Sequence, residues 1–440
     1  MRFLSVLVLL VTATRLLAAS DLQTELGQVL PGVPAEIQQV HEHMMKQRRE
    51  GDVGAAVATA SRIVHLVKQT ATEDNSLLLA KPYSDLATLQ LSSADFENAK
   101  TNFNLCIDIL QSHKGIFAEQ LVLPLHGLGI TLTEEGEYSE ATLAFRRAQH
   151  ITHRIHGVYA LEQITMVDQL SRVDLLAGNL ESANQESKFA LKINEVEYGK
   201  DDPRVVPAIE KLARYFVARG NNHDAVALYR RAVDIIETNF SETDLRLSEP
   251  LLSLGKIGMQ QSDYRSRGEN ALERRQNIIS ESIEADVADR VKALVDLADA
   301  YIISSNRKAT TVYQHAWDLI KDKPDFAELR EEIFGTPYRL YPHPRILPIG
   351  PFPSAGSQEL YVDVDFTVRD DGHVTDIEII DANVPNESQR SLRSEMYSYR
   401  YRPRMIDGRP VVSEQLSLHQ AYVIVKRQTS SKITIQPDFQ

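Results

Sequence analysis

Small and aromatic residues recur at a fixed spacing over the first three quarters of the chain. Each copy starts at a Gly or another small residue, with Ala five positions later, an aromatic residue nine positions later and a small residue twelve positions later. The clearest copy is Gly136, Ala141, Phe145 and Ala148. Copies start at 51, 94, 136, 178, 220, 262 and 304, spaced by 42 or 43 residues, and those at 51 and 262 are degenerate. A spacing kept over seven copies predicts an internal repeat.

A second helical stretch precedes each copy, such as 125–132 before Gly136. Two packed helices joined by a turn form one unit of an α-solenoid, so the pattern predicts a mostly α fold of about seven helical pairs. These residues resemble tetratricopeptide (TPR) repeats, in the 42-residue variety of kinesin-light-chain-like arrays. The resemblance covers residues 36–320, which we take as the solenoid.

The periodicity changes after residue 320. Prolines are dense over 321–357, which predicts a linker, because proline removes a backbone donor and disfavours helix before it. Alternating apolar and polar residues then predict a strand from Leu360 to Val368, and Asp371-Gly372 predicts a hairpin turn into a second strand. A short amphipathic helix around Leu392 and a third strand over 416–425 complete a β-β-α-β order.

This small α+β segment, residues 358–427, resembles the C-terminal domain of TonB. The residues that carry the resemblance are 364–368 leading into Asp371-Gly372, the Tyr401-Arg402-Pro403 segment after the helix, and Asp407-Gly408. A polar tail, 428–440, would follow. The resemblance implies a periplasmic domain that adds an extended peptide of an outer-membrane receptor or another envelope protein to a strand edge. We expect that edge to be the last strand, with the following candidate residues: Ser417, His419, Ala421, Val423 and Val425.

The N-terminus has the pattern of a secretory signal over residues 1–19. Arg2 precedes an apolar stretch, and small residues up to Ser20 offer a cleavage site. Arg15 interrupts the apolar run before it reaches bilayer-spanning length. We therefore expect a periplasmic protein, with an uncleaved inner-membrane anchor as the alternative. That alternative would make the chain an atypical TonB-type energy transducer for outer-membrane transport.

Composition narrows the function classes. Lys and Arg number 48 against 61 Asp and Glu, a net charge of −13, which argues against nucleic acid as a partner. The single cysteine, Cys106, excludes an intramolecular disulfide and a CxxC metal or redox site. Because Cys106 occupies the small-residue position that Ala148 fills in the next copy, we expect it to be a buried packing residue.

Three cations suggest a binding groove on the first helices of the repeats. Arg172, Arg214 and Lys256 are 42 residues apart, so they would lie in a row able to hold a carboxylate or an acidic peptide. The alternative is local pairing, since Asp168 and Glu210 precede the two arginines by four residues.

The sequence gives no catalytic motif, so we expect a non-catalytic protein with protein or peptide partners and no cofactor or metal. Its solenoid would hold one partner and its C-terminal domain another. An enzyme that uses His150 and His153 as a metal pair is a further alternative. His150, His153 and His156 cannot all converge, because six residues turn a helix by about 240°.

Overall fold

The computed structural model describes residues 30, 32–341, 360–425 and 434–438. The predicted signal, residues 1–19, lies outside this part of the chain. The structure divides into two compact units, which meet in the sequence at Lys200 and Asp201. Among the described residues, no helix is long and apolar enough to cross a membrane.

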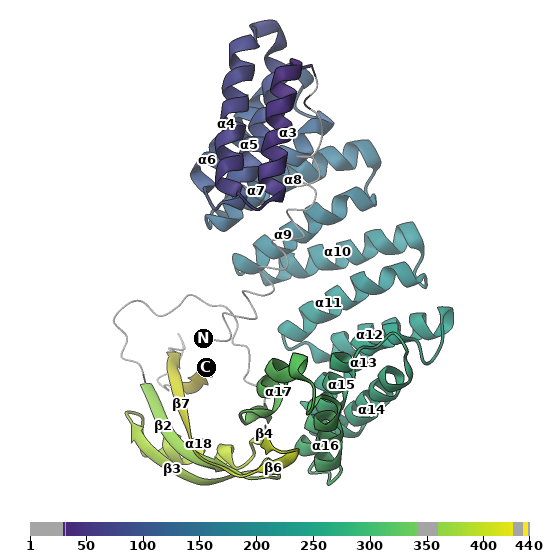
Figure 1. The fold of residues 1–440 in the computed structure, drawn as a ribbon, viewed down its shortest axis with the longest axis vertical. Helices are drawn as coiled ribbons and strands as arrows, with labels where there is room; N and C mark the ends of the chain where they lie inside the picture. Colours follow the sequence, from purple (N-terminus) through teal and green to yellow (C-terminus); the bar gives the residue numbers. More distant parts are fainter. Residues whose placement is uncertain (1–29, 31, 342–359, 426–433, 439–440) are drawn as a thin grey trace. The chain divides into compact units, whose positions relative to one another are not determined.

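The first unit, which ends at Lys200, consists of consecutive helices that pack in pairs (Figure 1). Its helices are α3 (Ala35–Arg49), α4 (Val53–Thr70), α5 (Ala80–Ser92), α6 (Phe96–Lys114), α7 (Val122–Glu134), α8 (Tyr138–His156), α9 (Ile164–Leu176) and α10 (Leu180–Tyr198). Gly136 turns the chain between α7 and α8 with φ of 80°, a left-handed conformation that glycine adopts without strain. The predicted helical pairs are confirmed here.

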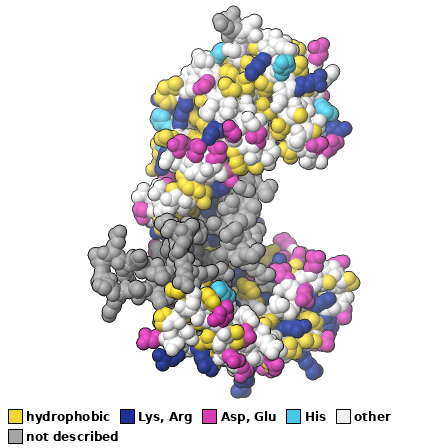
Figure 2. All heavy atoms as spheres, turned by 90° about the vertical axis from the view of Figure 1, so that its left-hand side faces the viewer, with side chains coloured by type: hydrophobic (Ala, Val, Ile, Leu, Met, Phe, Trp, Pro, Cys, Tyr) yellow, Lys and Arg dark blue, Asp and Glu magenta, His cyan; other side chains and the backbone are white. Residues whose placement is uncertain are grey.

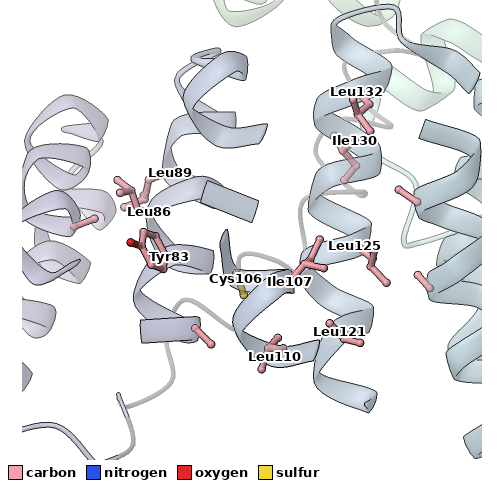
Figure 3. Close-up of a cluster of buried hydrophobic side chains, with 14 of the residues drawn as sticks. Tyr83, Leu86, Leu89, Cys106, Ile107, Leu110, Leu121, Leu125, Ile130 and Leu132 are labelled. Atoms are coloured by element: carbon pink, nitrogen blue, oxygen red, sulfur yellow. The ribbon is translucent and has the colours of Figure 1, made fainter. Parts of the chain in front are cut away.

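Signature residues form the core of the first unit. Ala141, Phe145 and Ala148 are all fully buried. Gly129 lies against the Phe145 ring so closely that a Cβ there would be 2.6 Å from a ring carbon. Cys106 is buried in the same apolar cluster, near Ile107 and Leu125 (Figure 3), which agrees with a packing role. Burial raises the pKa of its thiol to about 12.

The second unit, from Asp201, begins with three further helical pairs. They comprise α11 (Val206–Ala218), α12 (Asn222–Asn239), α13 (Ser248–Met259), α14 (Arg265–Glu281), α15 (Val287–Ile303) and α16 (Ala309–Ile320). The degenerate copy at 262 departs from the fixed spacing. Its buried residues include Gly268, Leu272 and Arg275, which lie one position later than a strict 42-residue repeat of Ala225, Tyr229 and Ala232 in α12 requires.

Residues 321–341 do not form the predicted linker. They contain a 3₁₀ turn at Pro324–Phe326, helix α17 (Ala327–Phe334) and strand β1 (Tyr338–Tyr341). Pro324 stands at the start of the turn, where proline is tolerated, and Phe334 and Leu340 are buried in the core of the last repeat. The linker predicted from proline density was therefore wrong for 321–341, because apolar residues of this segment pack into the core. The remainder of the predicted linker, 342–357, lies outside the described residues.

The C-terminal part has the predicted β-β-α-β order, with added short strands. Its elements are β2 (Leu360–Val368), β3 (Val374–Ala382), α18 (Asn386–Met396), β4 (Arg400–Arg402), β5 (Arg404–Ile406), β6 (Arg409–Val411), β7 (Ser413–Val425) and β8 (Thr434–Asp438). The main antiparallel sheet has the order β3-β2-β7-β8, while β1 pairs with β4 and β5 with β6. Strand β8 lies within the predicted polar tail, so 434–438 is paired chain rather than tail.

A buried ion pair joins the C-terminal strands to the last repeat. Arg402 of β4 donates two hydrogen bonds to Asp299 of α15, at 2.9 and 2.6 Å, and a third to the Ile333 carbonyl. Tyr313 also donates to Asp299, at 2.6 Å. Burial alone lowers the pKa of Arg402, but the Asp299 carboxylate outweighs burial and raises it. The domain is thus fixed to α15 by a charged, largely buried contact.

Candidate interaction surfaces

The three predicted groove cations have different surroundings. Arg172, on α9 of the first unit, has a side chain only 13% exposed and contacts Glu134 of α7 at 2.8 Å. Glu134 lies on the first helix of the preceding repeat, so this cation belongs to a contact between repeats. Its charge is therefore poorly placed to receive a ligand.

Arg214 and Lys256, both in the second unit, are more accessible. Their side chains are 51% and 57% exposed. Arg214 lies 3.9 Å from Glu210, as the local-pairing alternative proposed, and 4.0 Å from Glu249, while Lys256 lies 4.0 Å from Asp296. Ion pairs this long and this exposed contribute little to stability. Two of the three predicted cations therefore remain candidates for binding an acidic group.

Four exposed apolar side chains lie on the loops between repeats in the first unit. Ile116 and Phe117 connect α6 to α7, and Val158 and Tyr159 connect α8 to α9, exactly one 42-residue period later. Each of the four is between 41% and 58% exposed. We call these four residues the loop patch. Exposed apolar side chains that gather in a patch are typical of an interaction surface, whereas single ones are common. Here two such side chains are neighbours in each loop, and the pair recurs in the next repeat.

Each aromatic ring of the loop patch contacts a side chain on the second helix of the following repeat. The Phe117 ring makes an edge contact with His150, at 5.7 Å between centroids, and the Arg154 guanidinium lies 4.4 Å from its centre. The Tyr159 ring lies 6.0 Å from that of Phe189 on α10. These contacts fix the rings, and Arg154 places a cation beside them. A partner that offers apolar side chains flanked by carboxylates would match this chemistry.

Sequence reasoning missed the loop patch, although a signal was present. The tetrapeptides from Gly115 and from Gly157 both read Gly, aliphatic, aromatic, Ala, whereas the equivalent loop has Lys200 and Asp201. Comparing loops between repeats, rather than signature positions alone, would have shown that two loops are apolar and the next is charged.

The pairing of β7 leaves only part of the predicted strand edge open to another strand. One side of β7 pairs with β2, from Leu360↔Tyr422 to Val368↔Ser413. The other side pairs with β8 over Ala421–Val425, so the backbones of Ala421, Val423 and Val425 are occupied. From Ser413 to Gln420, β7 has only β2 as a ladder partner among the described strands. Ser417 and His419 therefore remain as candidate edge residues.

The side chains of Ser417 and His419 interact with carboxylates of β2. Ser417 donates to Asp365 at 2.7 Å, and His419 Nδ1 lies 2.6 Å from Asp363. The His419 ring also stacks on Tyr361 at 5.3 Å. Backbone pairing with an added strand does not require these side chains, so their bonds to β2 leave strand addition possible.

Two of the histidines considered for a metal site make contacts of other kinds. His150 contacts Phe117, and His156 lies 3.6 Å from Glu119. Within the described ranges, no three His, Cys, Asp or Glu side chains are grouped closely enough to hold a metal ion. On the face drawn in Figure 2, cations and carboxylates are interspersed with apolar side chains, and no broad basic surface is visible.

Several solved structures are similar to this chain, and they are repeat proteins. The nearly identical TPR-like repeats of a Podosopora anserina protein assigned as a kinesin light chain are 16% identical, with 48% of this chain and 100% of that chain covered and a TM-score of 0.42. The C-terminal part of a TPR repeat-containing protein from Cytophaga hutchinsonii is 12% identical, with coverage of 65% and 98% and a TM-score of 0.45. The Rap conjugation gene regulator of plasmid pLS20, in complex with a Phr peptide, is 14% identical, with coverage of 69% and 80% and a TM-score of 0.34.

No family model and no curated protein matches the chain. The solenoid fold therefore rests on the helical pairs themselves, described above.

Proposed function

We propose that this protein is a non-catalytic scaffold that binds protein partners through its solenoid and its C-terminal sheet. The observation that carries the proposal is the loop patch. Its four large apolar side chains lie at equivalent places in adjacent repeats. The two aromatic rings among them contact neighbouring rings, and Arg154 lies beside Phe117. Burying them against a partner would remove apolar surface from water, which is the main favourable contribution in protein association.

Affinity capture with the full-length protein tests the role of the loop patch. A Phe117→Ser/Tyr159→Ser variant removes both rings, and both positions are exposed, so the fold should tolerate the change. Ile283→Ser is a matched control, because that side chain is 98% exposed and lies in the other unit. We expect the wild type and the control to retain the same partner, measured by quantitative mass spectrometry, and the double variant to lose it. Equal retention by all three proteins would overturn the proposal.

The finer proposal is that the scaffold works in the periplasm and that its C-terminal domain adds a strand from an envelope protein. The support is the signal-like pattern of residues 1–19, the TonB-like sequence features, and the half-open edge of β7 from Ser413 to Gln420. Mass analysis of the N-terminus in the producing cell tests export. A mature start near Ser20 is expected, whereas an intact Met1 in a membrane fraction would favour the anchored transducer.

Strand addition has its own test. Replacing Leu418 by Pro would remove a β7 backbone donor, but β7 already pairs with β2 through this region, so the folded sheet must be checked by circular dichroism. A cleaner probe is cysteine cross-linking from Ser417→Cys to a partner strand. We expect cross-links at Ser417→Cys and not at Tyr397→Cys, an exposed position on the same domain. Cross-links at neither position would argue against strand addition.

A further inference from the structure

Two arginines of the second unit lie where α14 meets strands β1 and β4. They are Arg265, the first residue of α14, and Arg400, the first residue of β4. The Nε atom of each is buried and has no hydrogen-bond partner among the described residues. Within the same described ranges, no ion pair joins either guanidinium to a carboxylate. A buried donor without a partner carries a free-energy penalty, so two at one place need an explanation.

Backbone pairing places Arg400 between two other residues of this site. Arg400 pairs with Tyr341 of β1 on one side and with His373, in the turn between β2 and β3, on the other. Residues directly opposite each other on paired strands have their side chains on the same face, so these three side chains are neighbours. The Arg265 guanidinium lies 5.0 Å from the centre of the Tyr341 ring. Arg265 therefore approaches the same row of side chains from α14.

The two positive charges are close enough to affect each other. Burial lowers the pKa of Arg400, and the charge of Arg265 lowers it further. The Asp371 carboxylate opposes this lowering, but it has other contacts. It accepts a hydrogen bond from the His373 backbone N–H at 3.1 Å and lies 3.4 Å from Arg369. Like charges held together in a partly buried place repel each other, and an anion between them would remove that repulsion.

The guanidinium of Arg400 is held so that one edge faces away from its fixed contacts. Nη1 donates to the carbonyls of Tyr397 and Tyr399, at 3.2 and 2.9 Å. The other edge, Nε and Nη2, is the edge by which Arg402 binds the Asp299 carboxylate. Such an edge binds an oxyanion through two parallel hydrogen bonds.

The site can be reached from solvent. The side chains of Arg265, Tyr341, His373 and Arg400 are half-buried rather than enclosed. Donors approach from α14, from β4 and from the turn between β2 and β3, and the oxygens of a tetrahedral anion also point in several directions. The two oxygens of a carboxylate lie in one plane and suit a single guanidinium edge better.

We propose that this site binds a phosphate group, held by Arg265 and Arg400 with His373 beside it. The phosphate would join α14 to β1 and β4, and so strengthen the attachment of the C-terminal strands next to the Asp299–Arg402 contact. The proposal goes beyond the scaffold role and does not depend on it, because no residue of the loop patch takes part.

Isothermal titration calorimetry of the full-length protein with sodium phosphate, at constant ionic strength, tests the site. We expect one phosphate to bind, and Arg265→Gln and Arg400→Gln each to lose at least tenfold in affinity, because each removes charge-assisted hydrogen bonds. Arg267→Gln is the matched control. Arg267 is exposed two positions later on α14, with its guanidinium 5.3 Å from the Tyr264 ring centre, and its loss should leave phosphate binding unchanged.

Thermal unfolding followed by Trp317 fluorescence separates an anion site from a purely structural role of the arginines. Without phosphate, Arg265→Gln should unfold at the temperature of the wild type or above it, because the repulsion of Arg400 is gone. With phosphate about tenfold above its Kd, the wild type should gain about 3 °C and Arg265→Gln should gain nothing. Arg265→Lys keeps the charge without the planar fork and should gain less than the wild type.

Three results would overturn the proposal. They are the absence of phosphate binding, equal binding by Arg265→Gln and the wild type, and equal affinity for acetate, which would indicate a carboxylate site. Glycerol 2-phosphate distinguishes the sources of the phosphate group. Binding as tight as that of inorganic phosphate would support a site for phosphate monoesters, and failure to bind would support a site for the free ion.

Discussion

The repeats of the first unit and the end of the solenoid in the second unit bury very different side chains at comparable places. Around α7 and α8, the core consists of Ala141, Phe145 and Ala148. Around α14 and α15, Arg275 is buried at the small-residue place and bonds to Asp296 at 3.0 Å, and Asp299 holds Arg402. The first of these regions is packed by apolar contacts, whereas the second adds paired charges to an apolar core.

The difference shows what each kind of core can specify. Apolar packing tolerates any partner of suitable shape, whereas a buried charge must meet its counter-charge or carry a large penalty. A regular repeat needs only the next repeat as its neighbour. The last repeat must instead receive one particular domain in one position, and the bidentate Asp299–Arg402 contact supplies that selectivity.

The largest expected effect is Phe145→Ala, on the apolar side of the comparison. The ring is fully buried against Gly129, so its loss leaves a cavity and should lower the free energy of unfolding of the first unit by about 4 kcal/mol. Urea unfolding followed by circular dichroism measures it. Phe117→Ala is the control: that ring is 44% exposed and its loss should cost less than about 1 kcal/mol. Similar effects at both positions would contradict the packing described for α8.

Asp299→Ala tests the buried ion pair between Asp299 and Arg402 in the second unit. It leaves the Arg402 guanidinium, only 12% exposed, without its carboxylate, and should destabilise the second unit by about 3 kcal/mol. Trp317 is the only tryptophan of the chain and packs on Phe334, so its fluorescence reports this region during denaturation. Limited proteolysis should release the C-terminal domain sooner.

Two controls make the Asp299 result specific. Asp299→Leu/Arg402→Met replaces the pair by apolar side chains and should recover most of the stability. Asp318→Ala breaks the exposed Lys321–Asp318 pair and should cost less than about 1 kcal/mol. If Asp299→Ala behaves like Asp318→Ala, the ion pair does not anchor the domain.

Fixed periodicity was sufficient to predict most of the helices and the principal strands. Alternation predicted the strand at Leu360–Val368 with its observed bounds, and the signature placed Phe145 and Cys106 in the core. Both patterns report burial on one face, which is the property that a sequence encodes most directly.

The parts that were missed depend on contacts between distant residues. The shifted face of α14 follows from the approach of Gly258 to Gly268, and α17 is anchored by Phe334 against a core that no local pattern describes. The partner of Arg402 is 103 residues away, at Asp299. A single sequence gives the charge of each residue but not the pairing.

Cys106 gives a smaller effect, which depends on pH. Burial raises the pKa of its thiol from the ordinary value of 9.0 to about 12, so the folded protein keeps the proton when the unfolded chain has lost it. Fewer protons on the unfolded state mean that stability falls as pH rises above about 9. Between pH 8 and pH 10, the wild type should lose about 1 kcal/mol more than Cys106→Ala.

Thiol labelling checks the same property. Iodoacetamide at pH 8 should leave native Cys106 unmodified and label it fully in urea, because only the unfolded chain exposes a thiolate. Rapid labelling of the native protein would show that the α6 core opens readily.

The smallest expected effects belong to the accessible groove cations. Arg214→Ala and Lys256→Ala should each change the free energy of unfolding by less than about 0.5 kcal/mol, because their nearest carboxylates are 3.9 to 4.0 Å away and both side chains are half exposed. Arg172→Ala should cost more, since it removes the 2.8 Å contact to Glu134 between repeats. Chemical denaturation of the three variants measures these differences in the free energy of unfolding.

An Arg214→Ala/Lys256→Ala protein of unchanged stability that no longer retains a captured partner would place binding on the first helices as well. Unchanged capture would leave the loop patch and the β7 edge as the binding surfaces.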